Sequence, residues 1–191
     1  MKPKLVLLAS GAGTLVQAII DAVAQEKLEA SISLVLSDQP ASQVISRAQE
    51  AHIPSLVIPM QKDRTKWDAE IFIAVEKCSP DLVVSAGFMR VLAPAFVERF
   101  RTINAHPALL PKFRGAWAIS ETLESGESVG GTTIHWVDAG VDTGEIIAQR
   151  EVAILDDDDA NSLHERIKIV ERVLIVETIR DILPTLRTPD E

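Results

Sequence analysis

Short apolar runs alternate with stretches of helical periodicity in the first half of this sequence, and that alternation restricts the fold more than any other feature. The apolar runs cover residues 4–9, 31–37, 55–58, 82–85 and 102–105, and helical patterns over 14–27, 41–51, 65–78 and 94–99 separate them. Alternation of this kind is typical of βαβ units, and strands that are apolar on both faces are typical of a parallel sheet covered on both sides. We therefore predict an α/β fold with an open, mostly parallel, doubly wound sheet of the Rossmann-like type.

The pattern changes after residue 106. A helical pattern covers 116–125, β-like runs cover 132–137 and 146–152, and a polar turn sequence over 138–144 joins these two runs. This arrangement predicts an antiparallel extension of the sheet. Apolar residues at 163, 167, 170 and 174 predict a long C-terminal helix over 160–183, with residues 184–191 frayed.

The composition limits the possible partners. The chain has 19 Lys and Arg residues and 28 Asp and Glu residues, a formal net charge of −9, which disfavours nucleic acid and anionic membranes. The single cysteine, Cys78, excludes an intramolecular disulfide and a cysteine-based zinc site. No apolar run approaches the roughly 18 residues of a membrane span. We expect a cytoplasmic monomer or homodimer that acts on small molecules, without a nucleic-acid or membrane partner and without a metal.

A glycine-containing turn, Ser-Gly-Ala-Gly-Thr at residues 10–14, joins the first predicted strand to the first predicted helix. Glycines let the backbone approach a ligand, and a helix N-terminus offers free N–H groups and a positive dipole to a phosphate. The turn is not a dinucleotide fingerprint, because Val16 occupies the position of the third glycine, and no Walker A sequence follows it. The pattern indicates a site for a single phosphate group, and a plain tight turn is the alternative interpretation.

Asn104 and His106 give the strongest chemical signal in the sequence. They lie two residues apart on a predicted strand, so they share one face, and Pro107 ends the strand directly after them. Ligands of open α/β sheets bind at this carboxyl end. An amide donor next to an imidazole suits a reaction that develops an oxyanion and moves a proton. Asp142, in the turn at 138–144, would favour a charged imidazolium if it lies near His106, although each residue alone also fits a structural role.

The other histidines carry weaker signals. His135 alternates with apolar neighbours and is a candidate for the wall of the same site. His52 precedes Ile-Pro in a predicted loop and His164 lies early in the last helix, so neither suggests a function.

Four motifs occur in order along the chain: Leu-Leu-Ala-Ser-Gly-Ala-Gly at 7–13, Ser-Ala-Gly-Phe-Met-Arg-Val-Leu at 85–92, Asn-Ala-His-Pro-Ala-Leu-Leu-Pro at 104–111, and Asp-Ala-Gly-Val-Asp-Thr-Gly at 138–144. Together they resemble the 10-formyltetrahydrofolate-dependent formyltransferases. The first turn and segment 163–171 resemble the phosphoribosylglycinamide formyltransferase family in particular. The resemblance extends over roughly residues 4–183.

The resemblance implies transfer of a formyl group from 10-formyltetrahydrofolate, a co-substrate, to the glycine amine of 5'-phosphoribosylglycinamide in de novo purine biosynthesis. No metal is implied. It also implies a single formyltransferase domain over residues 1–191, with a phosphate-binding half at 1–102 and a catalytic and folate-loop half at 103–191.

The resemblance also implies a set of site residues. The catalytic group would be Asn104, His106 and Asp142. The residues that bind the phosphoribosyl substrate would be Gly13, Thr14, Leu15, Lys168 and Glu171. The residues that bind the folate would be Arg64, Met89, Arg90, Val91, Leu92, Asn104, Ala139, Gly140 and Val141.

Two departures from the family pattern leave other acceptors open. Leu15 stands where many members have an asparagine, and Phe-Arg-Gly-Ala-Trp at 113–117 resembles the methionyl-tRNA formyltransferase branch. Methionyl-tRNA formyltransferases carry a further C-terminal domain and formyltetrahydrofolate hydrolases an N-terminal one, and this sequence matches neither arrangement. An amino-sugar nucleotide is another possible acceptor. A non-catalytic module that binds a phosphometabolite is the alternative outside the enzymes.

Overall fold

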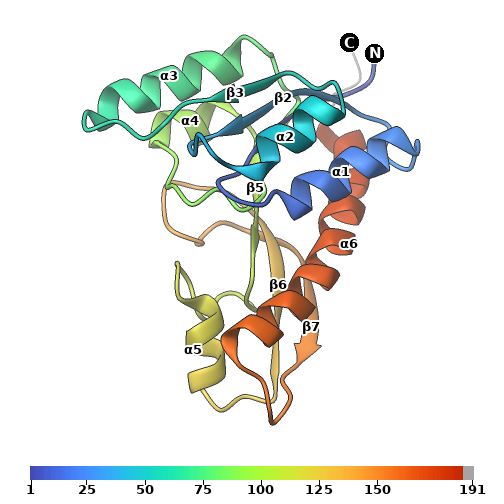
Figure 1. Ribbon diagram of the computed structural model, residues 1–191, viewed down its shortest axis with the longest axis vertical. Coiled ribbons are helices and arrows are strands. Elements are labelled where there is room, and N and C mark those ends of the chain that lie inside the picture. Colours follow the sequence, from blue (N-terminus) through green and yellow to red (C-terminus); the bar gives the residue numbers. More distant parts are fainter. Residues whose placement is uncertain (187–191) are drawn as a thin grey trace.

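One seven-stranded sheet runs through the structure, a computed structural model that describes residues 1–186 (Figure 1). The strand order is β3-β2-β1-β4-β5-β6-β7. The strands are β1 (Lys4–Leu8), β2 (Ser31–Ser37), β3 (Ser55–Val57), β4 (Leu82–Ser85), β5 (Thr102–His106), β6 (Val129–Trp136) and β7 (Ile146–Ala153). The first five pair in parallel, whereas β6 pairs antiparallel with both β5 and β7. The predicted parallel sheet with an antiparallel extension is confirmed.

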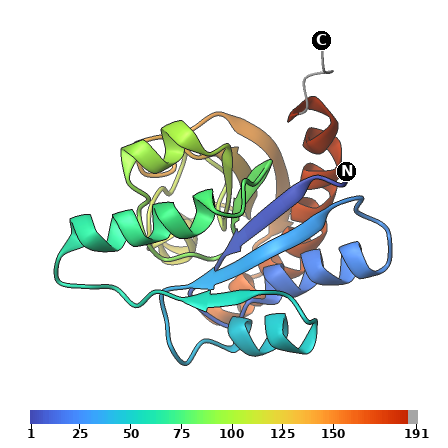
Figure 2. The same ribbon diagram turned by 90° about the horizontal axis from the view of Figure 1, so that it is seen from above.

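Helices cover both faces of the sheet (Figure 2). They are α1 (Thr14–Ala24), α2 (Gln43–Glu50), α3 (Arg64–Glu76), α4 (Pro94–Arg99), α5 (Ala118–Glu124) and α6 (Ala160–Leu186). Helices α1, α2 and α6 pack on one face, and α3 and α4 pack on the other. The doubly wound arrangement predicted from the sequence is therefore present.

The central strand β1 shows why its sequence is apolar throughout. Leu5 and Leu7 face the core beneath α1 and α6, whereas Val6 and Leu8 face the core beneath α3. All four side chains are fully buried. A strand buried on both faces has no position left for an exposed polar side chain, so the alternation typical of a half-exposed strand is lost.

Several element boundaries differ from the sequence prediction by one to three residues, and two of these differences have a clear physical reason. Strand β6 begins at Val129 rather than at 132. The earlier start was missed because it includes Gly131, where a Cβ would meet the Arg150 carbonyl oxygen at 2.3 Å. Glycine fits that close approach, but it does not carry a strand signal. Helix α6 continues through Pro184 to Leu186, so the fraying predicted from residue 184 is wrong for 184–186. Pro184 lies in the last turn, where few backbone hydrogen bonds remain to be lost. Residues 187–191 lie outside the part that the structure describes.

Gly13 connects the fold to the predicted phosphate turn. Its φ of 69° lies in the left-handed region, and a Cβ built there would meet Val44 Cγ2 of α2 at 2.5 Å. The turn can therefore pass between β1 and α2 only with glycine at this position.

We expect Gly13→Ala to lower the free energy of unfolding by about 2 kcal/mol or more, since both backbone strain and overlap with Val44 oppose the methyl group. Urea denaturation measures the change. Gly11→Ala is the matched control, because a Cβ at Gly11 meets nothing within 4 Å. Equal losses in the two variants would contradict this explanation.

Candidate active site

Three polar side chains lie in one row across neighbouring strands. Asn104 of β5 is in register with Ser85 of β4 on one side and with His135 of β6 on the other. Because β4 and β5 are parallel, Ser85 and Asn104 both lie near the carboxyl ends of their strands, where open α/β sheets bind ligands. His106 follows on the same face of β5 and ends that strand.

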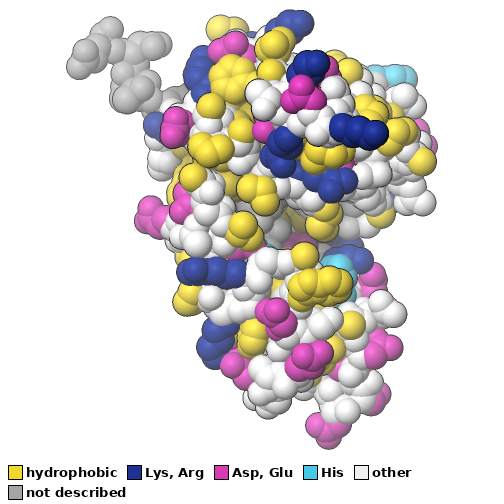
Figure 3. Space-filling view, turned by 90° about the vertical axis from the view of Figure 1, so that its left-hand side faces the viewer, with side chains coloured by type: hydrophobic (Ala, Val, Ile, Leu, Met, Phe, Trp, Pro, Cys, Tyr) yellow, Lys and Arg dark blue, Asp and Glu magenta, His cyan; other side chains and the backbone are white. Residues whose placement is uncertain are grey.

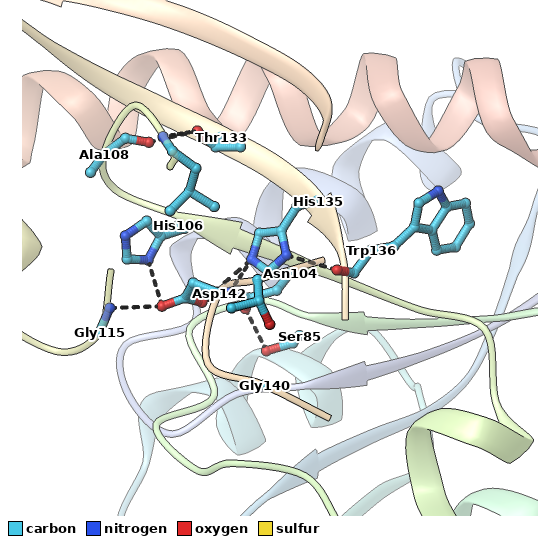
Figure 4. Close-up of polar contacts among 12 residues, drawn as sticks. Ser85, Asn104, His106, Ala108, Gly115, Thr133, His135, Trp136, Gly140 and Asp142 are labelled. Carbon is cyan, nitrogen blue, oxygen red and sulfur yellow. Dashed lines mark hydrogen bonds and ion pairs between the residues drawn. The ribbon is translucent and has the colours of Figure 1, made fainter. Parts of the chain in front are cut away.

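Asp142 reaches this row from the loop between β6 and β7. Its backbone adopts a φ of 51°, in the left-handed region that aspartate tolerates better than most residues. Its Oδ2 lies 3.4 Å from His106 Nδ1 and accepts a hydrogen bond of 2.9 Å from the Gly115 N–H (Figure 4). Its Oδ1 lies 3.4 Å from both Asn104 Nδ2 and His135 Nε2. The three residues predicted as the catalytic group are therefore brought together.

The His106 ring lies between two hydrogen-bond acceptors. Its Nε2 donates to the Phe113 carbonyl oxygen at 2.8 Å, and its Nδ1 faces the Asp142 carboxylate. A carbonyl only accepts, so Nε2 carries a proton, and the carboxylate favours a second proton on Nδ1. The side chain is only 5% exposed. The surroundings thus suit the charged imidazolium.

The Asp142 carboxyl group stays ionised despite its burial. Burial raises its pKa, but the Gly115 N–H and the charge of His106 are among the effects that outweigh burial and lower the pKa to about 2. A carboxylate held in this way keeps a fixed negative charge next to His106 over the whole neutral pH range.

A cavity of about 290 Å³ opens beside these residues. Its lining combines the row described above with the segment after β4 and the loop before β7. The wall contains Ser85, Gly87, Phe88, Met89, Arg90, Val91, Leu92, Asn104, Ala105, His106, Pro107, Gly115, Ala116, His135, Val137, Asp138, Gly140, Val141 and Asp142. All of the predicted folate residues except Arg64 and Ala139 line this cavity.

The predicted folate residues outside the wall remain near it. Arg64, at the start of α3, donates a hydrogen bond to the carbonyl oxygen of Val91, a wall residue. Ala139 precedes Gly140 in the loop. Met89 and Val91 are 71% and 53% exposed, so apolar side chains stand at the open side of the cavity. In the space-filling view, the surface is indented between the larger part with β1–β5 and the smaller part with α5 (Figure 3).

The predicted phosphate turn lies at a second, more open hollow. Ser10, Gly11 and Ala12 line it on one side, and Ser42, just before α2, lines it on the other, whereas the predicted phosphate residues Gly13, Thr14 and Leu15 are not part of its lining. The Leu15 side chain is buried in the core, so only its backbone is available to a ligand. The structure thus gives Leu15 a packing role where many members of the family have a polar side chain.

Lys168 and Glu171 of α6 have different partners. Lys168 Nζ lies 2.8 Å from Glu165 Oε1, whereas Glu171 is buried and its Oε1 accepts a hydrogen bond of 2.9 Å from Thr132 Oγ1. Burial raises the pKa of the Glu171 carboxyl group. Thr132 also lies 3.1 Å from the His106 carbonyl oxygen, so Glu171 packs directly behind the strand that carries His106.

Several groups of the site were missed by the sequence reasoning. Ser85 was given no role and His135 only a place in the wall, yet both contact Asn104, at 2.7 Å and 3.2 Å. Ser85 and His135 come next to Asn104 only through the pairing of β5 with β4 and β6, and this pairing of strands that are distant in sequence cannot be read from a local motif. The Phe113 carbonyl and the Gly115 N–H are backbone groups and leave no side-chain signal at all.

Within residues 1–186, no group of three His, Cys, Asp or Glu side chains is arranged to hold a metal ion. Within the same part of the chain, no helix is long and apolar enough to cross a membrane.

Comparison with known proteins identifies the family. The model of the formyl transferase family matches residues 3–179. Phosphoribosylglycinamide formyltransferase of Mycobacterium tuberculosis is 43% identical over 180 residues, which cover 92% of this chain and 83% of that protein. The Bacillus subtilis protein of the same name is 32% identical over 184 residues, 94% of each chain.

A solved structure agrees with these matches. Glycinamide ribonucleotide transformylase 1 from Symbiobacterium toebii superimposes with a TM-score of 0.94 at 33% identity, covering 99% of this chain and 91% of that one. The likeness therefore extends over the whole fold as well as the site motifs. The chain belongs to the formyl transferase family.

Proposed function

We propose that this protein transfers the formyl group of 10-formyltetrahydrofolate to the glycine amine of 5'-phosphoribosylglycinamide, a step of de novo purine biosynthesis. The observation that carries the proposal is the meeting of Asn104, His106 and Asp142 on the wall of one cavity. The names of the M. tuberculosis and B. subtilis relatives support this acceptor.

The cavity suits the ring end of a folate. Its volume of about 290 Å³ and its mixture of apolar side chains and backbone groups match a flat heteroaromatic ring with a polar edge. Arg64 and Arg90 lie next to the cavity, and each is ion-paired at 2.7 Å within the chain, to Asp68 and Asp38 respectively. The co-substrate would supply the formyl group, and the chain's own residues would supply binding and polarisation.

The mechanism follows from the donors at the cavity wall. As the amine attacks the formyl carbon, the formyl oxygen gains negative charge and needs hydrogen-bond donors. The Asn104 amide is the donor within reach, and the His106 imidazolium, whose two N–H groups face the Phe113 carbonyl oxygen and Asp142, adds positive charge beside it. The attacking amine loses a proton as its bond to the formyl carbon forms, and this proton passes through a water to the folate nitrogen as the bond between that nitrogen and the formyl carbon breaks.

The acceptor would be held on the other side of the reacting atoms. The backbone of Gly13, Thr14 and Leu15 begins α1 and offers free N–H groups to a phosphate. Lys168 can neutralise phosphate charge, and Glu171 can accept hydrogen bonds from ribose hydroxyls.

We keep several properties as predictions. They are a cytoplasmic location, the division of the chain at residue 103, a monomeric or dimeric state, and the lack of nucleic-acid, membrane and metal partners.

We predict that Asn104→Ala reduces kcat on the order of 10²–10³-fold, because it removes one preorganised donor to the oxyanion. His106→Ala should cost at least as much. The assay follows the tetrahydrofolate product by absorbance with glycinamide ribonucleotide, an amino-sugar nucleotide, methionyl-tRNA and water as acceptors. His52→Asn is the control, since His52 is an exposed loop residue with a φ of 56° that asparagine tolerates. Wild-type turnover in either site variant would refute the assignment, and preference for another acceptor would refute the substrate.

The lowered pKa of Asp142 predicts a pH dependence of stability. A carboxyl group whose pKa is lowered on folding stabilises the protein above its unfolded-state pKa, and the stabilisation is lost as the pH falls through the folded-state pKa. Since the pKa falls from 3.8 to about 2 and the side chain is 13% exposed, the loss between about pH 5 and 2 should be about 2 kcal/mol. Urea titrations of wild type and Asp142→Asn across this range measure it. Parallel curves for the two proteins would contradict the prediction.

Contacts to the phosphoribosyl group should be similar in ground and transition states, because they lie away from the reacting atoms. Lys168→Ala and Glu171→Gln should therefore raise the KM for glycinamide ribonucleotide about tenfold and leave kcat and the folate KM nearly unchanged. Glu165→Ala is the matched control, since it removes the ion-pair partner of Lys168 but no proposed substrate contact. An unchanged ribonucleotide KM in both site variants would place the acceptor elsewhere.

A further inference from the structure

Asn104 can donate to an oxyanion only if its Nδ2 side, and not its Oδ1 side, is directed to the reacting oxygen. Rotation of the amide by 180° exchanges donor and acceptor, and the acceptor would repel the same oxygen. The contacts that set this orientation therefore decide whether Asn104 can act. Ser85 and His135 flank it in the same row of the sheet.

The backbone sets the protonation of His135. Its Nδ1 lies 2.8 Å from the Trp136 carbonyl oxygen, which can only accept a hydrogen bond. Nδ1 therefore carries a proton, and in a neutral ring Nε2 is left as an acceptor. The side chain is 2% exposed, so solvent does not replace these partners.

The acceptor at Nε2 in turn sets the Asn104 amide. Asn104 Nδ2 lies 3.2 Å from His135 Nε2, and a neutral ring satisfies this contact only if the amide presents an N–H to it. The other end of the amide, Oδ1, then accepts from the Ser85 hydroxyl at 2.7 Å (Figure 4). Each hydrogen bond in this row has a single allowed direction, starting from the Trp136 carbonyl.

One Asn104 hydrogen remains for the substrate. It faces Asp142 Oδ1 at 3.4 Å, longer than the usual N–H···O distance of about 2.9–3.0 Å, so an incoming oxygen can compete for it. A doubly protonated His135 would instead face Asp142 Oδ1 with an N–H, also at 3.4 Å, and Asn104 would lose its acceptor. The neutral ring with its proton on Nδ1 is thus the state that supports the donor.

We propose that Ser85 and His135 are positioning residues that act through Asn104, by holding its amide with one N–H free to meet the formyl oxygen. This role rests on the proposed formyl transfer, because the oriented donor matters only if an oxyanion develops there. It differs from a structural role in one respect: the two side chains, although they line the proposed folate cavity, should affect kcat through Asn104 more than the binding of either substrate.

Kinetics of single variants test this distinction. Ser85→Ala should lower kcat about tenfold and His135→Phe more than tenfold, with both KM values within about twofold of wild type. Ser85→Thr keeps the hydroxyl and should restore kcat to within about threefold. Ser31→Ala, in β2, is the control, since its hydroxyl bonds only the Pro3 carbonyl oxygen away from the site. An effect confined to KM, or no rescue by Ser85→Thr in a folded variant, would overturn the proposal.

A double-mutant cycle tests whether the effect passes through Asn104. In an Asn104→Ala background the amide is absent, so Ser85→Ala should change kcat by less than about twofold. If Ser85 only supports the fold, its tenfold cost should persist in that background. Persistence of the full cost would overturn the proposal.

The protonation of His135 can be read without turnover. Imidazole ¹⁵N resonances of the ligand-free protein at neutral pH, assigned with His135→Phe, should show a protonated Nδ1 and an unprotonated Nε2. A doubly protonated ring or the reverse tautomer would overturn the proposed orientation. An enzyme with the expected tautomer but no formyl transfer would refute the proposed function instead, so the two failures are distinguishable.

Discussion

The arrangement of the site depends on the contacts of the Asp142 carboxylate, whose side chain is only 13% exposed. It joins three parts of the chain that are separate in sequence: His106 and Asn104 on β5, the Gly115 N–H of the segment before α5, and its own loop between β6 and β7. An ionised carboxylate at this depth is stable only because donors surround it. The same donors are then arranged around the cavity, so the burial of one charge organises the candidate catalytic groups.

The antiparallel extension of the sheet makes this arrangement possible. Parallel strands bring only their carboxyl ends to the ligand edge, and β4 and β5 contribute Ser85 and Asn104 in this way. Strand β6 runs in the opposite direction, so His135 enters the same row from a different part of the sequence. The loop after β6 then returns across the carboxyl ends and carries Asp142 to the cavity.

The sequence predicted most of the fold because periodicity is a local property. Fully apolar strands such as β1 and the regular spacing in α6 were recognisable without tertiary information. The start of β6 was not, since Gly130 and Gly131 pack closely without any strand propensity. The end of α6 was also misjudged, because Pro184 is tolerated in a last turn that Leu183 anchors in the core.

The candidate site could be predicted where its side chains share one face of a single strand. Asn104 and His106 share a face by their spacing alone. The partners of Asn104 depend on which strands lie next to β5, and strand order is not a local property of any motif. The Phe113 carbonyl contact to His106 depends on the path of an irregular segment in which Phe113 itself has a φ of 54°. No residue-type pattern encodes that path.

The Thr132 hydroxyl links Glu171 of α6 to the backbone of His106 on β5. The Thr132 hydroxyl has one hydrogen and two acceptors within reach, the Glu171 carboxyl group at 2.9 Å and the His106 carbonyl oxygen at 3.1 Å. If the hydroxyl turns toward His106, the carboxyl group must bring its own proton, and burial raises its pKa in that direction. If a ligand donates to Glu171, the carboxylate no longer needs the hydroxyl, which can then bond the His106 carbonyl.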